Sequence, residues 1–253
     1  MSMTSETIIE FKSVSFGYDS TKKILENVSF CINKGESIGL VGANGAGKST
    51  LMKLLLGLET NFDGNITVAG LSVNKKNLAD IRKKTGFVLQ NSDNQLFCHT
   101  VYDDICFGPV NYGYAKEEVS DMAEKAMEMT GTGYLKDVAN YKLSGGEKKL
   151  AAIASILSLM PEIIIMDEPE SSLDPANRKR IKNLVNSLEG TKIIASHDLD
   201  FIWETTDRVL LLGDGTIKAF GNTKDILIDE ILLNENSLTI PNCAIIEELR
   251  SRK

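Results

Sequence analysis

The sequence predicts an α/β fold in which helices cover a largely parallel sheet, with antiparallel strands near the N-terminus and a helical segment inserted later. Three observations favour this fold. Strand-like and helix-like segments alternate from about residue 36 onward, a glycine-rich loop joins a continuous apolar segment to a helix, and residues 91–142 interrupt the alternation with aromatics, loops and a helix. Alternation of this kind is typical of a parallel sheet wrapped by helices.

Residues 7–41 read as strands. TIIEFKSVSFGY alternates between apolar and polar residues, a turn follows near Asp19–Lys22, and ILENVSFCI leads to a second turn at 33–35. The next segment, ESIGLVG, is almost entirely apolar, as expected of a strand buried on both faces.

Later elements follow from hydrophobic periodicity. Helical spacing is expected after the glycine loop, in the middle of the inserted segment, after residue 146 and after residue 174. The positions that carry these four patterns are Leu51, Leu54, Leu55 and Leu58; Val119, Met122, Ala123 and Ala126; Leu150, Ile153, Ala154 and Leu157; Ile181, Leu184, Val185 and Leu188. Short strands are expected at 64–70, 85–90, 162–168 and 191–196, with a short helix over 77–84.

Composition excludes some classes of function. The chain has 253 residues, is 42% hydrophobic and carries a formal net charge of −7. This charge argues against broad nucleic-acid binding, which requires a basic excess. No apolar run approaches the roughly 20 residues that span a bilayer, and the first residues lack a signal-peptide pattern, so we expect a cytosolic protein. The four cysteines show no zinc-site spacing, and we interpret Cys98 beside His99 as an ordinary thiol.

The segment GANGAGKST, residues 42–50, matches the phosphate-binding pattern G-x-x-x-x-G-K-[ST]. Its glycines allow backbone N–H groups to surround phosphate oxygens at a helix N-terminus. Lys48 would neutralise the β- and γ-phosphates, and the Ser49 hydroxyl would help to bind Mg²⁺. The predicted nucleotide-binding positions of the loop are Gly42, Asn44, Gly45, Ala46, Gly47, Lys48, Ser49 and Thr50.

Two carboxylates close the apolar run IIIM. Asp167 and Glu168 are expected at the carboxyl edge of the sheet, where ligands bind in open α/β folds. Asp167 would hold Mg²⁺ through water, and Glu168 would act as the general base toward the attacking water. The alternative, a helix cap before Pro169, explains one acid and not both.

Together with LSGGE at 143–147 and His197 after a strand, these motifs resemble the ATPase subunits of ABC transporters, in the order of that family and from about residue 7 to 220. The resemblance implies a P-loop NTPase fold with a RecA-like parallel-sheet core, an N-terminal antiparallel β subdomain and an inserted α-helical subdomain at about 91–160. Residues 1–220 would form this ATPase domain, and residues 221–253 a short helical tail.

The resemblance also implies roles for single residues. Gln90 would reach Mg²⁺ and the attacking water, His197 would contact the γ-phosphate, and Asp174 would link two active sites across a dimer. Tyr18 would stack on adenine, although a plain strand aromatic remains an alternative. A lone histidine such as His197 is more often structural, but this one follows a buried strand.

LSGGE further implies a dimer. Ser144, Gly145 and Gly146 begin a helix, and in the family they cap the γ-phosphate that the other subunit holds. Two ATP molecules would then lie between two copies, or between this chain and a paralogue. Glu147 replaces the commoner glutamine of this motif, which we expect to be tolerated because Ser144 and the backbone make the contacts.

The segment QNSDNQLF at 90–97 resembles the energy-coupling-factor group of importers, with Ser92 in place of a proline. This resemblance implies an ATP-hydrolysing subunit on the cytoplasmic face of the membrane that drives uptake of cobalt, nickel or a vitamin, with integral-membrane scaffold and substrate-binding components as partners. An aromatic-rich region (Phe97, Tyr102, Phe107 and Tyr112) would contact the membrane partner or fill the small lobe. Another ABC transporter class, a soluble ABC ATPase acting on ribosomes or DNA, and a P-loop kinase remain as alternatives.

Overall fold

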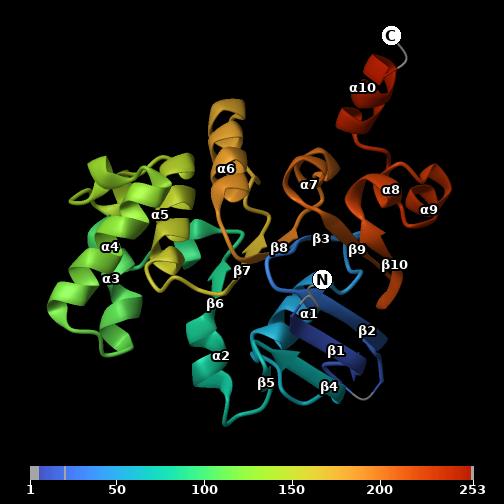
Figure 1. Ribbon diagram of the computed structural model, residues 1–253, viewed down its shortest axis with the longest axis horizontal. Coiled ribbons are helices and arrows are strands. Elements are labelled where there is room, and N and C mark those ends of the chain that lie inside the picture. The colour runs from blue at the N-terminus through green and yellow to red at the C-terminus, as the bar shows by residue number, and fades with distance from the viewer. Residues whose placement is uncertain (1–5, 20, 252–253) are drawn as a thin grey trace, which may run out of the picture. The chain divides into compact units, whose positions relative to one another are not determined.

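A computed structural model of the protein describes residues 6–19 and 21–251 (Figure 1). Residues 1–5 of the expected ATPase domain, residues 252–253 of the expected tail and Ser20 of the expected 19–22 turn lie outside the described residues. Chain contacts define two compact units. The first combines the residues up to Arg82 with those from Gly190 onward, and the second is Lys83–Glu189.

The first unit contains the expected antiparallel sheet, in the order β2-β1-β4-β5. Its strands are β1 (Thr7–Phe16), β2 (Leu25–Asn33), β4 (Asp63–Val68) and β5 (Leu71–Ser72). The alternating pattern places apolar side chains on one face, where Phe11 stacks on Phe30 with ring centroids 4.6 Å apart. Beyond β1, Asp19 Oδ1 accepts hydrogen bonds from the backbone N–H groups of Thr21 and Lys22, which fixes the turn.

The same unit contains parallel strands. The central strand β3 (Ser37–Val41) pairs in parallel with β8 (Thr191–Ala195) on one side and with β9 (Arg208–Gly213) on the other. A final strand, β10 (Thr216–Asn222), runs antiparallel to β9. All residues of β3 and β8 are buried, as their largely apolar sequences predict, and the burial includes the polar Ser37 and Thr191 and the charged Lys192.

Helices α1 (Lys48–Leu55), α7 (Leu199–Thr205), α8 (Thr223–Leu227), α9 (Glu230–Glu235) and α10 (Asn242–Ser251) belong to this unit, and α2 (Leu78–Lys84) lies at its boundary. The expected place of Leu58 on the buried face of α1 is wrong, because its side chain is 55% exposed. The helix ends at Leu55, and Gly57, with φ 60°, turns the chain away. Among the described residues, we find no helix that is both long enough and apolar enough to span a membrane.

In the second unit, β6 (Thr85–Val88) pairs in parallel with β7 (Ile163–Asp167). Helices α3 (Val101–Asn111), α4 (Lys116–Thr130) and α5 (Gly145–Leu157) pack against one another, and α6 (Pro175–Ser187) follows β7 (Figure 1). Short 3₁₀ turns are η1 (Ser92–Asn94), η2 (Gly133–Leu135) and η3 (Asn140–Lys142).

Hydrophobic periodicity did not indicate α3. Local signals explain this helix, because Thr100 and Asp103 form a capping box at its N-terminus, and Pro109 is tolerated inside it. The strand expected to reach Gln90 ends at Val88, since the backbone N–H of Leu89 bonds instead to the Gln95 side chain.

Candidate functional site

The glycine loop lies between β3 and α1, in the predicted context. Gly42, Gly45 and Gly47 have φ values of 151°, 81° and 107°, which favour glycine. A Cβ on Gly42 would lie 2.2 Å from the backbone oxygen of Leu212, so this position also requires glycine for space. The Lys48 ammonium donates to the carbonyl of Gly42 at 2.6 Å. The loop therefore combines inward-turned backbone with a cation, as an anion site requires.

The remaining loop residues divide by exposure. Asn44, Gly45 and Ser49 are exposed, whereas Ala46 and Thr50 are buried. Because Ser49 is in the first turn of α1 and exposed, its hydroxyl is accessible to a ligand.

Tyr18 lies beside the first turns of α1. Its side chain is 55% exposed, and its hydroxyl lies 3.5 Å from Thr50 Oγ1 and accepts a hydrogen bond from Lys53 Nζ at 3.2 Å. Phe16 packs edge-on against its ring at 5.0 Å. These contacts orient the ring next to the glycine loop and leave much of the side chain accessible, which is the arrangement that base stacking needs.

His197 and the start of the glycine loop line one cleft of about 590 Å³ in the first unit. His197 is exposed directly after β8, and Asp198 caps α7 by accepting a hydrogen bond from the N–H of Phe201. The structure therefore brings together two motifs, Gly42–Asn44 and His197, that are more than 150 residues apart in the sequence.

The same cleft is also lined by a segment that sequence reasoning missed. Residues 237–242 line it along with the glycine loop, and Ser237 has a left-handed φ of 58°. Nothing in this segment matches a nucleotide-binding pattern. Its place depends on the fold, and the only local signal was the polar and proline-containing sequence SLTIPN, which is typical of a loop.

The second unit joins Gln90 to Glu168. The Gln90 side-chain amide donates to Glu168 Oε2 at 2.7 Å. Asp167 is the last residue of β7, and both carboxylates are half-buried. Glu168 adopts φ 45°, a left-handed conformation that costs roughly 1–2 kcal/mol for a residue with a Cβ. Such strain clusters at functional sites.

Ser144 is the N-cap of α5. Its hydroxyl bonds with Glu147 in a capping box, and these hydrogen bonds hold the pKa of the Glu147 carboxyl below its usual range. Ser144 and Gly145 are exposed, while Gly146 is buried. A Cβ on Gly146 would lie 2.3 Å from the Asn177 side chain, so this position needs glycine for space.

Asp174 caps α6. Its Oδ1 accepts hydrogen bonds from the N–H groups of Ala176 and Asn177 at 2.9 and 3.0 Å, and its Oδ2 accepts one from Asn177 Nδ2 at 2.6 Å. The backbone hydrogen bond from Asn177 is the largest cause of the lowered pKa of Asp174. Since Asn177 also packs against Gly146, one side chain connects the LSGGE motif to Asp174.

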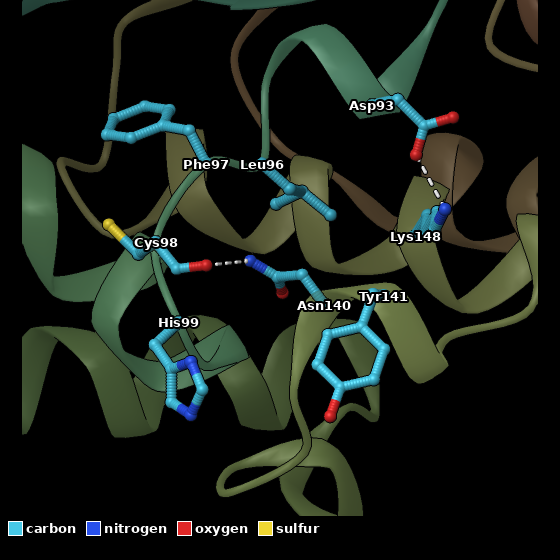
Figure 2. A pocket seen from close by; sticks show the side chains of 8 residues that line it. All are labelled: Asp93, Leu96, Phe97, Cys98, His99, Asn140, Tyr141 and Lys148. Atoms are coloured by element: carbon cyan, nitrogen blue, oxygen red, sulfur yellow. Dashed lines mark hydrogen bonds and ion pairs between the residues drawn. The ribbon is translucent and has the colours of Figure 1, made fainter.

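A separate cleft of about 290 Å³ adjoins η1 in the second unit (Figure 2). The Asp93–Lys148 ion pair lies at its edge, and Asn140 donates to the carbonyl of Cys98. Phe97 lines this cleft and is 65% exposed. Its ring packs edge-on against Phe107, which is also exposed, with centroids 4.7 Å apart.

The four aromatics expected to act together lie in three different environments. Phe97 and Phe107 form an exposed pair, which we call the aromatic pair. Tyr102 is half-buried, with its hydroxyl donating to Ser120 and Lys136 over its ring, so it contributes to the helical core. Tyr112 lies near Lys83.

Asp104 organises the loop that carries Phe97. It is 4% exposed, and its Oδ1 accepts hydrogen bonds from the N–H groups of Phe97 and Cys98, each at 3.1 Å. Desolvation, followed by the charge of Asp104, raises the pKa of the Cys98 thiol to about 11. A thiol in this state is a poor metal ligand, because metals bind the thiolate.

The chain is similar to known proteins in sequence and in structure. The sequence profile described as ABC transporter matches residues 25–171. A putative ABC transporter ATP-binding protein of Streptomyces coelicolor is 39% identical over 92% of this chain and 90% of its own. The energy-coupling factor transporter ATP-binding protein EcfA of Methanocaldococcus jannaschii is 36% identical over 97% of this chain and 90% of its own. Among solved structures, CbiO1 of Clostridium perfringens, described as part of the ABC transporter complex CbiONQ, has a TM-score of 0.82 at 31% identity, covering 96% of this chain and 99% of that one.

Proposed function

Because this chain belongs to the ABC transporter family and is an ABC ATPase, we propose that it is the ATP-hydrolysing subunit of an energy-coupling-factor type importer. The observation that carries this proposal is the similarity to EcfA over nearly the whole chain. The segment QNSDNQLF, which is present at 90–97, supports the same subclass. The cargo would be a metal ion such as cobalt or nickel, or a vitamin.

The proposal assigns nucleotide binding to the first unit. Backbone N–H groups of Gly42–Thr50 and the Lys48 ammonium would hold the phosphates. Tyr18 would stack on adenine, because its ring is fixed beside α1 and much of its side chain is exposed. His197 would contact the γ-phosphate from the cleft that it shares with Gly42–Asn44.

Mg²⁺ fits the donor set. Ser49, Gln90 and Asp167 offer hydroxyl, amide and carboxylate oxygens, the ligands that Mg²⁺ prefers. Because the Gln90 amide nitrogen faces Glu168, its oxygen is the atom available to a cation. When bound, Mg²⁺ would neutralise charge on the phosphates.

Hydrolysis needs a base beside the attacking water. Glu168 would accept the proton of that water. The Gln90 amide, which donates to the Glu168 carboxylate at 2.7 Å, would orient this carboxylate. The carboxylate is half-buried at the end of β7, where it is accessible to water.

ATP would act between two copies of the chain, or between this chain and a paralogue. Ser144, Gly145 and Gly146 would cap the γ-phosphate held by the other subunit, and Asp174 would link the two sites. Binding would close the pair and hydrolysis would open it, a population shift whose free energy can move a partner.

The aromatic pair and its cleft would receive an apolar segment of the membrane scaffold, and the subunit would lie on the cytoplasmic face of the membrane. A substrate-binding membrane component would complete the importer. We further propose that residues 1–220 form the ATPase domain, with the helical subdomain at about 91–160, and that residues 221–253 form a helical tail.

The variant Glu168→Gln tests hydrolysis and dimer formation together. It should bind ATP, lose at least about 99% of the hydrolysis rate, since a general base contributes about 10²–10⁴-fold, and elute as a dimer in size-exclusion chromatography with ATP and Mg²⁺. Glu162→Gln is the control, because Glu162 forms only a half-exposed ion pair with Lys84. A Glu168→Gln protein that stays monomeric with ATP would contradict the proposed dimer.

Affinity capture from detergent-solubilised membranes tests the subclass. A scaffold protein together with a small integral-membrane protein should accompany the wild-type chain, and Phe97→Asp should lose both while it retains ATP binding. Recovery of two large permease subunits would instead assign the chain to another importer class.

A further inference from the structure

Lys149 lies on the α5 helix and is buried, with 3% of its surface exposed. Fully buried lysines are rare because desolvation of the ammonium is costly. Its Nζ donates to the carbonyl oxygen of Gln90 at 2.7 Å and to that of Leu89 at 3.2 Å. The side chain therefore connects α5 to the backbone of the residue that contacts Glu168.

The side chain of Gln95 also bonds to the backbone of Leu89 and to α5. Its Oε1 accepts a hydrogen bond from the N–H of Leu89 at 2.9 Å, while its Nε2 donates to the carbonyl of Ala152 at 2.8 Å and to Ser155 Oγ at 3.2 Å. Both the N–H and the carbonyl of Leu89 are thus fixed by side chains that belong to α5 or bond to it.

Burial and three carboxylates have opposite effects on the charge of Lys149. Burial lowers the pKa of Lys149, and the carboxylates of Glu170, Asp167 and Glu168 oppose that effect. A neutral side chain would avoid the desolvation cost, but it would leave two backbone carbonyls without this donor. We therefore attribute the presence of a lysine at this position to the hydrogen bonds that it donates to the carbonyls of Leu89 and Gln90, and not to packing alone.

We infer that Lys149 is a positioning residue for ATP hydrolysis, which fixes the Leu89–Gln90 backbone to α5 so that the Gln90 side chain stays within hydrogen-bond reach of Glu168. This inference rests on the proposed function for the roles of Gln90 and Glu168. Since Ser144–Gly146 begin the same helix, any displacement of α5 would reach Gln90 through the same contacts.

Steady-state ATP hydrolysis by three variants of the full chain tests the inference. Lys149→Met removes the donor at similar length, and Lys149→Arg retains a cation with donors. Lys84→Met is the matched control, because Lys84 lies in the same unit and forms a half-exposed ion pair with Glu162. Far-UV circular dichroism and thermal unfolding report whether each variant is folded.

For Lys149→Met, we expect kcat to fall about tenfold or more, equivalent to ~1.4 kcal/mol in the barrier, with the KM for ATP within about twofold of wild type. Lys149→Arg should recover most of the rate, and Lys84→Met should match wild type. A folded Lys149→Met protein with wild-type kcat overturns the inference, as does a parallel loss of ATP affinity.

The two proposals fail differently. If Glu168→Gln abolishes hydrolysis and Lys149→Met does not affect it, the role of Lys149 is wrong and the proposed function stands. A wild-type protein without ATPase activity would remove both. Should Lys149→Met not fold, Lys149→Gln shortens the side chain that donates to the Leu89 and Gln90 carbonyls, and Gln95→Leu removes the acceptor of the Leu89 N–H. An unchanged kcat in both folded variants overturns the inference.

Discussion

Replacement of Asp104 by alanine should strongly destabilise the helical part of the second unit. The Asp104 carboxylate accepts hydrogen bonds from the backbone N–H groups of Phe97 and Cys98 and from the side-chain amide of Asn140. Each buried donor left without an acceptor costs about 1–3 kcal/mol. With three donors, partly within reach of water, we expect Asp104→Ala to lower the free energy of unfolding by about 3–5 kcal/mol.

The variant Asp104→Asn removes the negative charge but keeps the size and shape of the side chain, so it separates the effect of the charge from that of the geometry. Asp104→Asn keeps one oxygen for the two backbone donors but places an amide N–H₂ against the Asn140 Nδ2 donor. The loss should therefore be smaller, about 1–2 kcal/mol. Asp121→Ala, on the exposed face of α4, serves as the surface control and should change stability by less than about 0.5 kcal/mol.

Urea unfolding followed by far-UV circular dichroism is the suitable assay, because α3, α4 and α5 contribute much of the helix content. Tryptophan fluorescence is less suitable, since the single tryptophan, Trp203, lies in the first unit. A free energy of unfolding for Asp104→Ala within about 1 kcal/mol of wild type, at unchanged m-value, would refute the reasoning. So would an asparagine variant less stable than the alanine variant.

Three further predictions concern binding and reactivity. Lys48→Ala should raise the Kd for ATP about 10–150-fold in isothermal titration calorimetry, because it removes a charged donor worth about 1.5–3 kcal/mol; an unchanged Kd would exclude Lys48 from the phosphate site. Tyr18→Ala should raise the Kd about 5–150-fold through loss of about 1–3 kcal/mol of stacking, and Tyr18→Phe should bind nearly as wild type; equal losses in both variants would favour a role for the hydroxyl. Since its pKa is raised to about 11, Cys98 has a thiolate fraction of only ~10⁻³ at pH 8, and its alkylation, followed by mass spectrometry, should quicken about tenfold per pH unit up to that pKa. Rapid alkylation at pH 7 would contradict this prediction.

The fold could be predicted from sequence because its parallel core strands are rich in apolar residues. SIGLV and TKIIA are both buried strands, and the glycine loop lies between strand and helix where expected. The family comparison confirms the predicted resemblance to ABC transporter ATPases and, through EcfA and CbiO1, to the energy-coupling-factor group. The roles of individual site residues stay predictions.

Other features depend on contacts that no local pattern encodes. Lys149 follows LSGGEK, and a lysine is mostly exposed in proteins, whereas tertiary packing buries this one. The wall at 237–242 forms part of a cleft only after the chain has folded back to β3. Leu58 was misplaced because its apolar spacing continued past the turn at Gly57.

The strands that pair with β3 also affect the order in which parts of the chain fold during synthesis. The strand that leads into the glycine loop pairs with β8 and β9, and the backbone N–H of Ser37 bonds to Asp207, 170 residues later. Because synthesis proceeds from the N-terminus, a ribosome-bound chain that has exposed only residues up to about 190 has the loop sequence but neither partner strand. We therefore expect the loop to reach its folded conformation only after these distant pairings have formed, late in folding.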